Sequence, residues 1–420
     1  MLPRTLPVAT LAAAFGAFVF ACGGTGTEET LPAVVPDAPS STDAPPAMAD
    51  AVADTPSDAR PSETSTPEAG AGSKLGKLAE GWAANEWHEL PGAPLASVLL
   101  THAEADAIDP GIWQVSGSSS AITIWASGAF DGRRLYVGSA GGHGGYNGNE
   151  MYAYDFQTLS WSRLYDPSPL AACAGSGSGT DCRAVWGPQA SHHYDALVHS
   201  KKTDSLFFMN WGRCWVWRLS EPDPKRGWKE FACATNMSGQ YPATAEDPKT
   251  GAIVVFSGGS SGLAALDPET LTWSRLTGKD SVYGTYQVLD VDPVRRKAFF
   301  MGAWTGGPHY EHANVTAIDL DGDPLAVASA SESEPPKELH NSCFLHHPRS
   351  GKMIAWNGDE RLWSYDPDAD RWTSVTTTGV KPTSSSTNGV FQKCAYLADV
   401  DLFVGYNDER RGMFAIRASL

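Results

Sequence analysis

The stretch Ser139–Trp161, SAGGHGGYNGNEMYAYDFQTLSW, decides the fold of this 420-residue chain. It reads as a glycine-rich turn, a polar loop, an alternating strand, and a second turn that leads into a strand containing Trp161. Shorter versions recur along the chain, where Trp273 and Trp372 each lie six residues after an Asp, as Trp161 follows Asp155. Recurrence of this kind indicates one repeated supersecondary unit rather than several unrelated domains.

Six apolar runs mark the second strand of each unit. Apolar side chains on both faces predict strands that are buried between layers. The runs are Leu135–Val137, Leu206–Met209, Ile253–Phe256, Ala298–Met301, Met353–Trp356 and Leu402–Val404. A turn precedes each run, and an alternating strand follows most of them. We therefore predict an all-β fold, a single six-bladed β-propeller of four-stranded antiparallel units, with a seventh blade hidden in residues 91–120 as the alternative.

The sixth unit lacks its last strand, because the chain ends at Leu420. The segment Trp87-His88-Glu89-Leu90 resembles Trp161-Ser162-Arg163-Leu164 and supplies a candidate. We predict that this N-terminal strand pairs with the C-terminal strand and closes the ring, so that no sheet edge stays open.

Residues 1–22 carry the features of an export signal. Arg4 provides a positive start, and the apolar core that follows is too short to predict a transmembrane helix. The segment ends in Val19-Phe20-Ala21-Cys22, which resembles a bacterial lipobox. The resemblance implies that Cys22 is lipidated and becomes the mature N-terminus, and an ordinary signal peptide cleaved nearby is the alternative.

Residues 23–77 are rich in Pro, Ala, Thr and Asp and hold few large apolar side chains. Such a segment cannot bury enough surface to offset its ordering entropy, so it predicts a disordered tether. We expect residues 78–420 to form the propeller. The predicted location is the bacterial cell envelope, at the outer membrane or the cell surface, reached through the N-terminal lipid alone.

Net charge and cysteine count restrict the function further. A formal net charge of −17 argues against a nucleic-acid partner, because no basic field attracts phosphates. With Cys22 set aside, six of the seven cysteines remain to pair in an oxidising compartment. If Leu219 pairs with Trp228 across a hairpin, Cys214 and Cys233 lie opposite each other. The other predicted pairs are Cys173–Cys182, which flank a Gly/Ser run, and Cys343–Cys394, for which two buried free thiols are the alternative.

The pair Gly141-Gly142, the alternating tyrosines Tyr152 and Tyr154, and Trp161 together resemble a Kelch repeat of the galactose-oxidase-like kind, over about residues 84–420. The resemblance implies a fold and leaves the activity open. We do not expect the copper site of that family, which uses a Tyr crosslinked to a Cys, because the cysteines are assigned to pairs. No cofactor is expected.

Strand direction in an antiparallel unit places the connections between the second and third strands, and those between successive units, at one end. These connections are long and polar, and we call the surface they form the long-loop face. Aromatic rings there could stack on sugar rings, while Asn, Gln and His could bind hydroxyl groups. The candidate ligand-binding residues are Tyr146, Asn149, His193, Gln240, Trp304, His309 and His340. The HxxH spacing of His309 and His312 lies in a loop without any further metal motif, so no metal is expected.

A second resemblance concerns His143 and Tyr194. A Gly-Gly-His loop after the first unit's second strand, and a Tyr at the start of a later first strand, are similar to propeller-type ulvan lyases, which have one blade more. The resemblance implies β-elimination at a uronic acid. Tyr194 or His143 would remove the C5 proton, and Arg213 would neutralise the carboxylate.

The sequence therefore leaves three functions in order. We expect first a surface-tethered monomeric propeller that binds a glycan or an envelope protein on its long-loop face. The alternatives are a polysaccharide lyase acting on uronic-acid glycans and a structural envelope component.

Overall fold

The structure, a computed structural model, describes the greater part of the chain after residue 72. The described residues are 73–138, 145–174, 181–210, 212–234, 242–256, 263–276, 285–303, 315–322, 329–331, 333, 335–336, 339, 341–384 and 388–420. Within them the secondary structure is mostly β-strand, as predicted.

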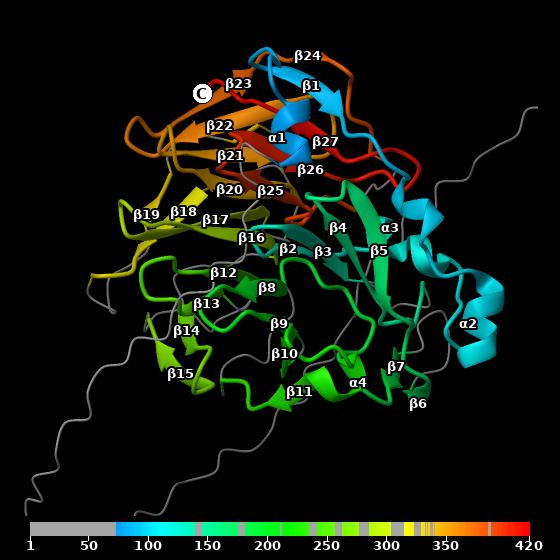
Figure 1. Ribbon diagram of the computed structural model, residues 1–420. Helices are drawn as coiled ribbons and strands as arrows, with labels where there is room; N and C mark the ends of the chain where they lie inside the picture. The colour runs from blue at the N-terminus through cyan, green and yellow to red at the C-terminus, as the bar shows by residue number, and fades with distance from the viewer. Residues whose placement is uncertain are drawn as a thin grey trace, which may run out of the picture. The chain divides into compact units, whose positions relative to one another are not determined.

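Six antiparallel sheets form the blades of a propeller (Figure 1). Blades 1 to 3 contain β2 (Gly128–Phe130), β3 (Arg134–Gly138), β4 (Met151–Asp155), β5 (Ser160–Tyr165); β8 (Leu197–Ser200), β9 (Ser205–Asn210), β10 (Arg213–Arg218), β11 (Trp228–Phe231); and β12 (Ala243–Glu246), β13 (Ile253–Phe256), β14 (Leu263–Asp267), β15 (Thr272–Arg275). Blades 4 to 6 contain β16 (Thr285–Asp292), β17 (Lys297–Ala303), β18 (Val315–Asp319), β19 (Ser329–Ala330); β20 (Cys343–His347), β21 (Lys352–Trp356), β22 (Leu362–Asp366), β23 (Arg371–Val375); and β25 (Cys394–Leu397), β26 (Leu402–Gly405), β27 (Phe414–Ile416), β1 (Glu86–Glu89) with β24 (Thr378–Gly379).

The first strands of the blades form a closed ring. Each contacts the next in the order β2, β8, β12, β16, β20 and β25, and β25 contacts β2 again. The alternative of a seventh blade is excluded, because the segment between β1 and β2, described throughout, forms only short helices. They are η1 (Leu95–Ser97), α2 (His102–Ile108), η2 (Gly117–Ser119) and α3 (Ser120–Thr123). The six-bladed prediction is confirmed.

The N-terminal strand closes the ring as predicted. Strand β1 pairs antiparallel with β27, with Trp87 opposite Ile416, and on its other edge pairs parallel with β24 (Figure 1). Ahead of it, α1 (Lys74–Leu78) begins at Ser73, whose side chain accepts a hydrogen bond from the Gly76 backbone N–H. Leu75 is fully buried in the core between blades 6 and 1. The packed residues thus begin shortly before residue 78.

The repeated Asp–Trp spacing has a physical cause in the turn between the third and fourth strands. The Asp side chain accepts a hydrogen bond at 2.8–3.0 Å from the backbone N–H two residues further on, in Asp155, Asp267 and Asp366. The residue four positions after the Asp has a positive φ of 44–57° in all three turns. The Trp then lies opposite the residue before the Asp, as Trp161 lies opposite Tyr154. The repeat therefore encodes a turn and a register.

Packing occurs between blades rather than inside one continuous core. Separate clusters of buried side chains lie between blades 1 and 2, 2 and 3, 3 and 4, 4 and 5, 5 and 6, and 6 and 1. Their members come from the apolar second strands and their neighbours, as the six runs predicted. Each blade is therefore stabilised by both of its neighbours, so that closure of the ring contributes to every interface.

Two predicted disulfides are confirmed, with Cα–Cα distances of 5.4 Å for Cys214–Cys233 and 6.2 Å for Cys343–Cys394. The register argument for the first was wrong by two residues, because Trp217 and not Leu219 lies opposite Trp228. The helical turn α4 (Pro224–Gly227) lengthens this connection. In the extra hairpin of β6 (Leu170–Ala174) and β7 (Asp181–Ala184), Cys182 is disulfide-bonded and lies opposite Cys173, whose side chain is outside the described part of the structure.

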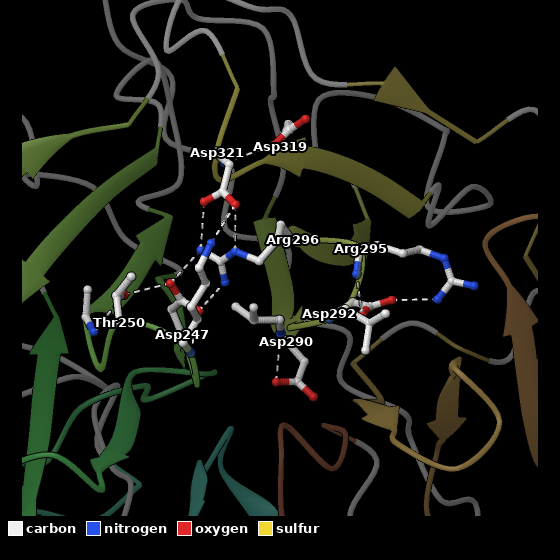
Figure 2. Close-up of polar contacts among 12 residues, drawn as sticks. Asp247, Thr250, Asp290, Asp292, Arg295, Arg296, Asp319 and Asp321 are labelled. Carbon is white, nitrogen blue, oxygen red and sulfur yellow. Dashed lines mark hydrogen bonds and ion pairs between the residues drawn. The ribbon is translucent and has the colours of Figure 1, made fainter.

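Ion pairs join neighbouring blades at the ends that carry the short turns. The Arg296 guanidinium lies between Asp247 of blade 3 and Asp321 of its own blade, with its Nη2 at 2.9 Å from Asp247 Oδ2 (Figure 2). Arg295 pairs with Asp292 and reaches Asp368 of blade 5. These contacts cross the blade interfaces where the apolar clusters end.

Replacing Arg296 by Met should lower the free energy of unfolding by about 2 kcal/mol at pH 7, because Asp247 loses a charged partner while its side chain stays only 5% exposed. Burial raises the pKa of Asp247, but hydrogen bonds from Arg296, Thr250 and the Lys249 backbone outweigh burial and lower it. The stabilisation is therefore present above the ordinary carboxyl pKa of about 4 and is lost as pH falls through the folded value. Urea unfolding at pH 7 and pH 3.5 checks this.

The matched control is Arg349→Met, whose side chain is 59% exposed and pairs with Asp401. An exposed pair contributes about 1 kcal/mol or less. Equal losses in the two variants, or no convergence of Arg296→Met with the wild type at low pH, would contradict the role given to Arg296.

Candidate functional site

A small pocket lies between blades 1 and 2, among the long connections that define the long-loop face. Its lining residues are Gly138, Asn149, Glu150, Met151, Tyr165, Pro188, Gln189, His193, Leu197, Phe208 and Trp228. The hollow holds about 290 Å³ of empty space, part of it open to solvent. Two residues that the sequence predicted as ligand-binding, Asn149 and His193, are brought together here.

Asn149 fixes the rim of the pocket. Its Nδ2 donates to the carbonyl oxygens of Trp186 and Pro188, both at 2.9 Å, and its Oδ1 accepts from the Ser168 backbone N–H at 2.7 Å. The start of β4 is therefore tied to the connection between blades 1 and 2. Because both amide atoms are engaged, Asn149 positions the loops rather than a ligand.

Glu150 lies buried behind the rim and holds two tyrosines. The hydroxyls of Tyr146 and Tyr152 donate to its Oε1 at 2.8 and 2.9 Å. Burial first, and then the nearby carboxylate, raise the pKa of both phenols, so both remain donors. The sequence predicted that Tyr146 would stack on a sugar, but its side chain is fully buried and no ligand can reach it.

His193 is the pocket's uncommitted polar side chain. Its backbone N–H donates to the Trp125 carbonyl at 3.1 Å, and its ring packs edge-on against Phe208 at 4.6 Å between centroids. Buried Nδ1 has no hydrogen-bond partner among the described residues. Burial, reinforced by His192 and Lys393, lowers the pKa of His193 to about 3. The imidazole is therefore neutral at physiological pH.

Trp228 and Tyr165 form an aromatic wall of the pocket. The indole Nε1 of Trp228 donates to the Tyr165 hydroxyl at 3.0 Å, which joins the outer strand of blade 2 to that of blade 1. Their polar atoms are therefore paired, and what the wall offers is aromatic surface.

Tyr194 lies where the first strands of several blades begin. Its ring contacts Trp125 of blade 1, Tyr286 of blade 4 and Phe391 of blade 6, at 5.3–6.3 Å between centroids. Its hydroxyl is 2.7 Å from His192 Nδ1, and the side chain is buried. The strand that the sequence predicted to begin at His192 begins instead at Leu197. Tyr194 itself has a φ of 52°, an uncommon conformation that functional sites often retain.

Arg213 is not brought to Tyr194 or to the pocket. It begins β10 and forms a bidentate pair with Glu230, at 2.7 and 2.9 Å, above the ring of Trp215. The other predicted residues lie outside the described part of the structure: Cys22, His143, Gln240, Trp304, His309 and His340.

Sequence reasoning missed a set of buried polar residues near the axis. The Asp195 carboxylate accepts from the Leu289 backbone N–H of blade 4 at 2.9 Å, and burial raises its pKa well above the ordinary value. Lys393 is fully buried, and its Nζ donates to the carbonyls of Ala126 and Gly389 at 3.0 and 3.1 Å. The available signal was a lysine inside the apolar segment 390–397.

Two further searches of the described residues returned nothing. They contain no group of three or more His, Cys, Asp or Glu side chains arranged to hold a metal ion. They also contain no helix that is long and apolar enough to cross a membrane.

Comparison with known proteins gives likeness of fold only. No family model and no curated protein matches the chain. Among solved structures, it is similar to an auxiliary nutrient binding protein from Bacteroides ovatus, with 11% identity, a TM-score of 0.45, and coverage of 70% of this chain and 68% of that one. It is also similar to a gluconolactonase from Xanthomonas campestris, with 12% identity, a TM-score of 0.43, and coverage of 78% and 97%. At such scores the likeness carries no argument about function.

Proposed function

We propose that this protein is an exported, lipid-anchored propeller of Kelch type that binds a glycan on its long-loop face. The observation that carries the proposal is the pocket between blades 1 and 2, where aromatic surface lies beside a buried, neutral histidine without a partner for Nδ1. Sugar-binding sites combine such features, because sugar rings have apolar faces and a rim of hydroxyl groups. Trp304 and His309, both beyond the described residues, are proposed to extend this surface.

A glycan array and an array of envelope proteins test the proposal with the chain from residue 73 onward. We expect binding to glycans that weakens when His193 is replaced. Binding confined to proteins would leave the long-loop face as a protein-docking surface instead. Absence of binding to either array would remove the ligand-binding function.

A polysaccharide lyase is the second candidate, and one contact favours it. The Tyr194 hydroxyl lies 2.7 Å from His192 Nδ1, the separation that a proton-transferring pair needs. Such an enzyme should release an unsaturated, ultraviolet-absorbing product from uronic-acid polymers, and Tyr194→Phe should abolish the release. A full panel of these polymers that yields no product would exclude the lyase.

The lipid anchor gives a separate prediction. Cells grown with a labelled fatty acid should transfer the label to the full-length protein, and Cys22→Ser should lose both the label and the membrane fraction, because the acylated thiol is gone. Ser41→Ala, in the proposed tether, is the control and should retain both. A Cys22→Ser protein that is still labelled would contradict lipidation at this position.

A further inference from the structure

We propose that the pocket between blades 1 and 2 accepts a hydroxyl group of a neutral sugar and rejects uronic acids, and that His193 is the residue that selects it. The inference rests on the proposed function, because it names the class of glycan that the same pocket would take. Charge, the two ring nitrogens and the size of the hollow support it.

The charge of the pocket disfavours an acidic ligand. Of the residues that line it, Glu150 is the acidic one, and no Lys or Arg is among them. Glu150 Oε1 accepts two phenol hydrogen bonds, an arrangement that suits a carboxylate acceptor. A uronate carboxylate entering here would meet a like charge in a poorly solvated site, where repulsion is stronger than in water.

His193 offers what a hydroxyl group needs. No hydrogen bond joins either ring nitrogen to the described residues, and the side chain is only 5% exposed. Because the imidazole is neutral, one nitrogen carries a proton and the other accepts one. A hydroxyl both donates and accepts, so it can pair with either tautomer, whereas a carboxylate can only accept. A buried polar group without a partner is costly, and a ligand hydroxyl would remove that cost.

The size of the hollow limits how far a ligand enters. The innermost space holds about one water-sized group, which suits a single hydroxyl. A sugar ring would stay at the mouth, against Trp228 and Tyr165. Gly138 keeps this space open, since a Cβ at that position would lie 3.1 Å from Cε1 and Nδ1 of His193.

The test is an array of neutral hexose and N-acetylhexosamine oligosaccharides printed beside their uronic-acid counterparts. We expect neutral glycans to bind and their uronates to bind at least tenfold more weakly. Uronates that bind as well as neutral glycans would overturn the inference while leaving glycan binding standing. Failure of every glycan would instead overturn the proposed function.

Variants then examine His193 itself by titration calorimetry with the best neutral hit. His193→Phe keeps a ring against Phe208 but removes both nitrogens, and we expect affinity to fall about tenfold, the loss of about one hydrogen bond. His193→Gln supplies a donor and an acceptor and should recover part of the affinity. His102→Phe, an exposed histidine on α2, is the matched control and should not change it. Equal affinity of His193→Phe and the wild type, or no recovery in His193→Gln, would overturn the role of His193.

Discussion

Replacing Trp87 by Ala should lower the free energy of unfolding by about 3–5 kcal/mol, the range for deleting a buried aromatic side chain. Trp87 is 1% exposed and belongs to the strand that closes the ring. Its ring packs against Trp356 and Phe403, at 5.9 and 6.1 Å between centroids, and its Nε1 donates to the Glu360 carbonyl at 3.0 Å. The substitution therefore removes packing between blades 5 and 6 and leaves a buried carbonyl without its donor.

Guanidinium unfolding of the chain from residue 73 onward measures the effect. The matched control is Trp372→Ala, which removes a half-buried Trp from the fourth strand of blade 5 and should cost less. If Trp87→Ala loses less than Trp372→Ala, the N-terminal strand does not contribute to stability in the way its position implies.

Replacing Lys393 by Met should change how stability depends on pH. Burial lowers the pKa of Lys393 from 10.5 to about 7, because two backbone carbonyls do not offset the loss of water around the ammonium group. Between these two pH values the unfolded chain holds a proton that the folded protein has released. The free energy of unfolding of the wild type therefore rises with pH by about 1.4 kcal/mol per unit from this group.

Lys393→Met lacks this contribution, so its stability relative to the wild type should be greatest at or below pH 7 and should fall by about 1.4 kcal/mol per pH unit towards pH 9. Urea unfolding of both proteins at pH 7, 8 and 9 checks the slope, and Lys229→Met, an exposed lysine of β11, should show none. A difference between Lys393→Met and the wild type that is constant across this range would show that Lys393 is not held in a poorly solvated site.

The prediction of the fold succeeded where neighbouring residues carry the information. Strand periodicity is local, and so is the turn in which Asp155 accepts a backbone hydrogen bond and Leu159 takes a positive φ. The hairpin of blade 2 shows the limit. Its disulfide partners were identified, yet its register was wrong by two residues, because a helical turn at Pro224–Gly227 cannot be inferred from strand patterns.

The candidate site was harder to predict, because side-chain exposure depends on which segments meet. Tyr146 lies in a polar, glycine-rich segment that favours an exposed ring, but Glu150 draws its hydroxyl inward. Arg213 looked available for a carboxylate ligand until the next strand supplied Glu230. His193 was correctly placed near Asn149, since strand direction alone assigns their loops to one face.

The sequence by itself determined the number of blades, the closing strand and two disulfide pairs, because repeats and strand alternation act over a few residues. Only the tertiary structure decided which polar groups are buried and which of them are paired. The pocket joins residues from Gly138 to Trp228, and the axial contacts join residues as distant as Ala126 and Lys393. Burial of this kind depends on ring closure, which brings together side chains that no local pattern relates.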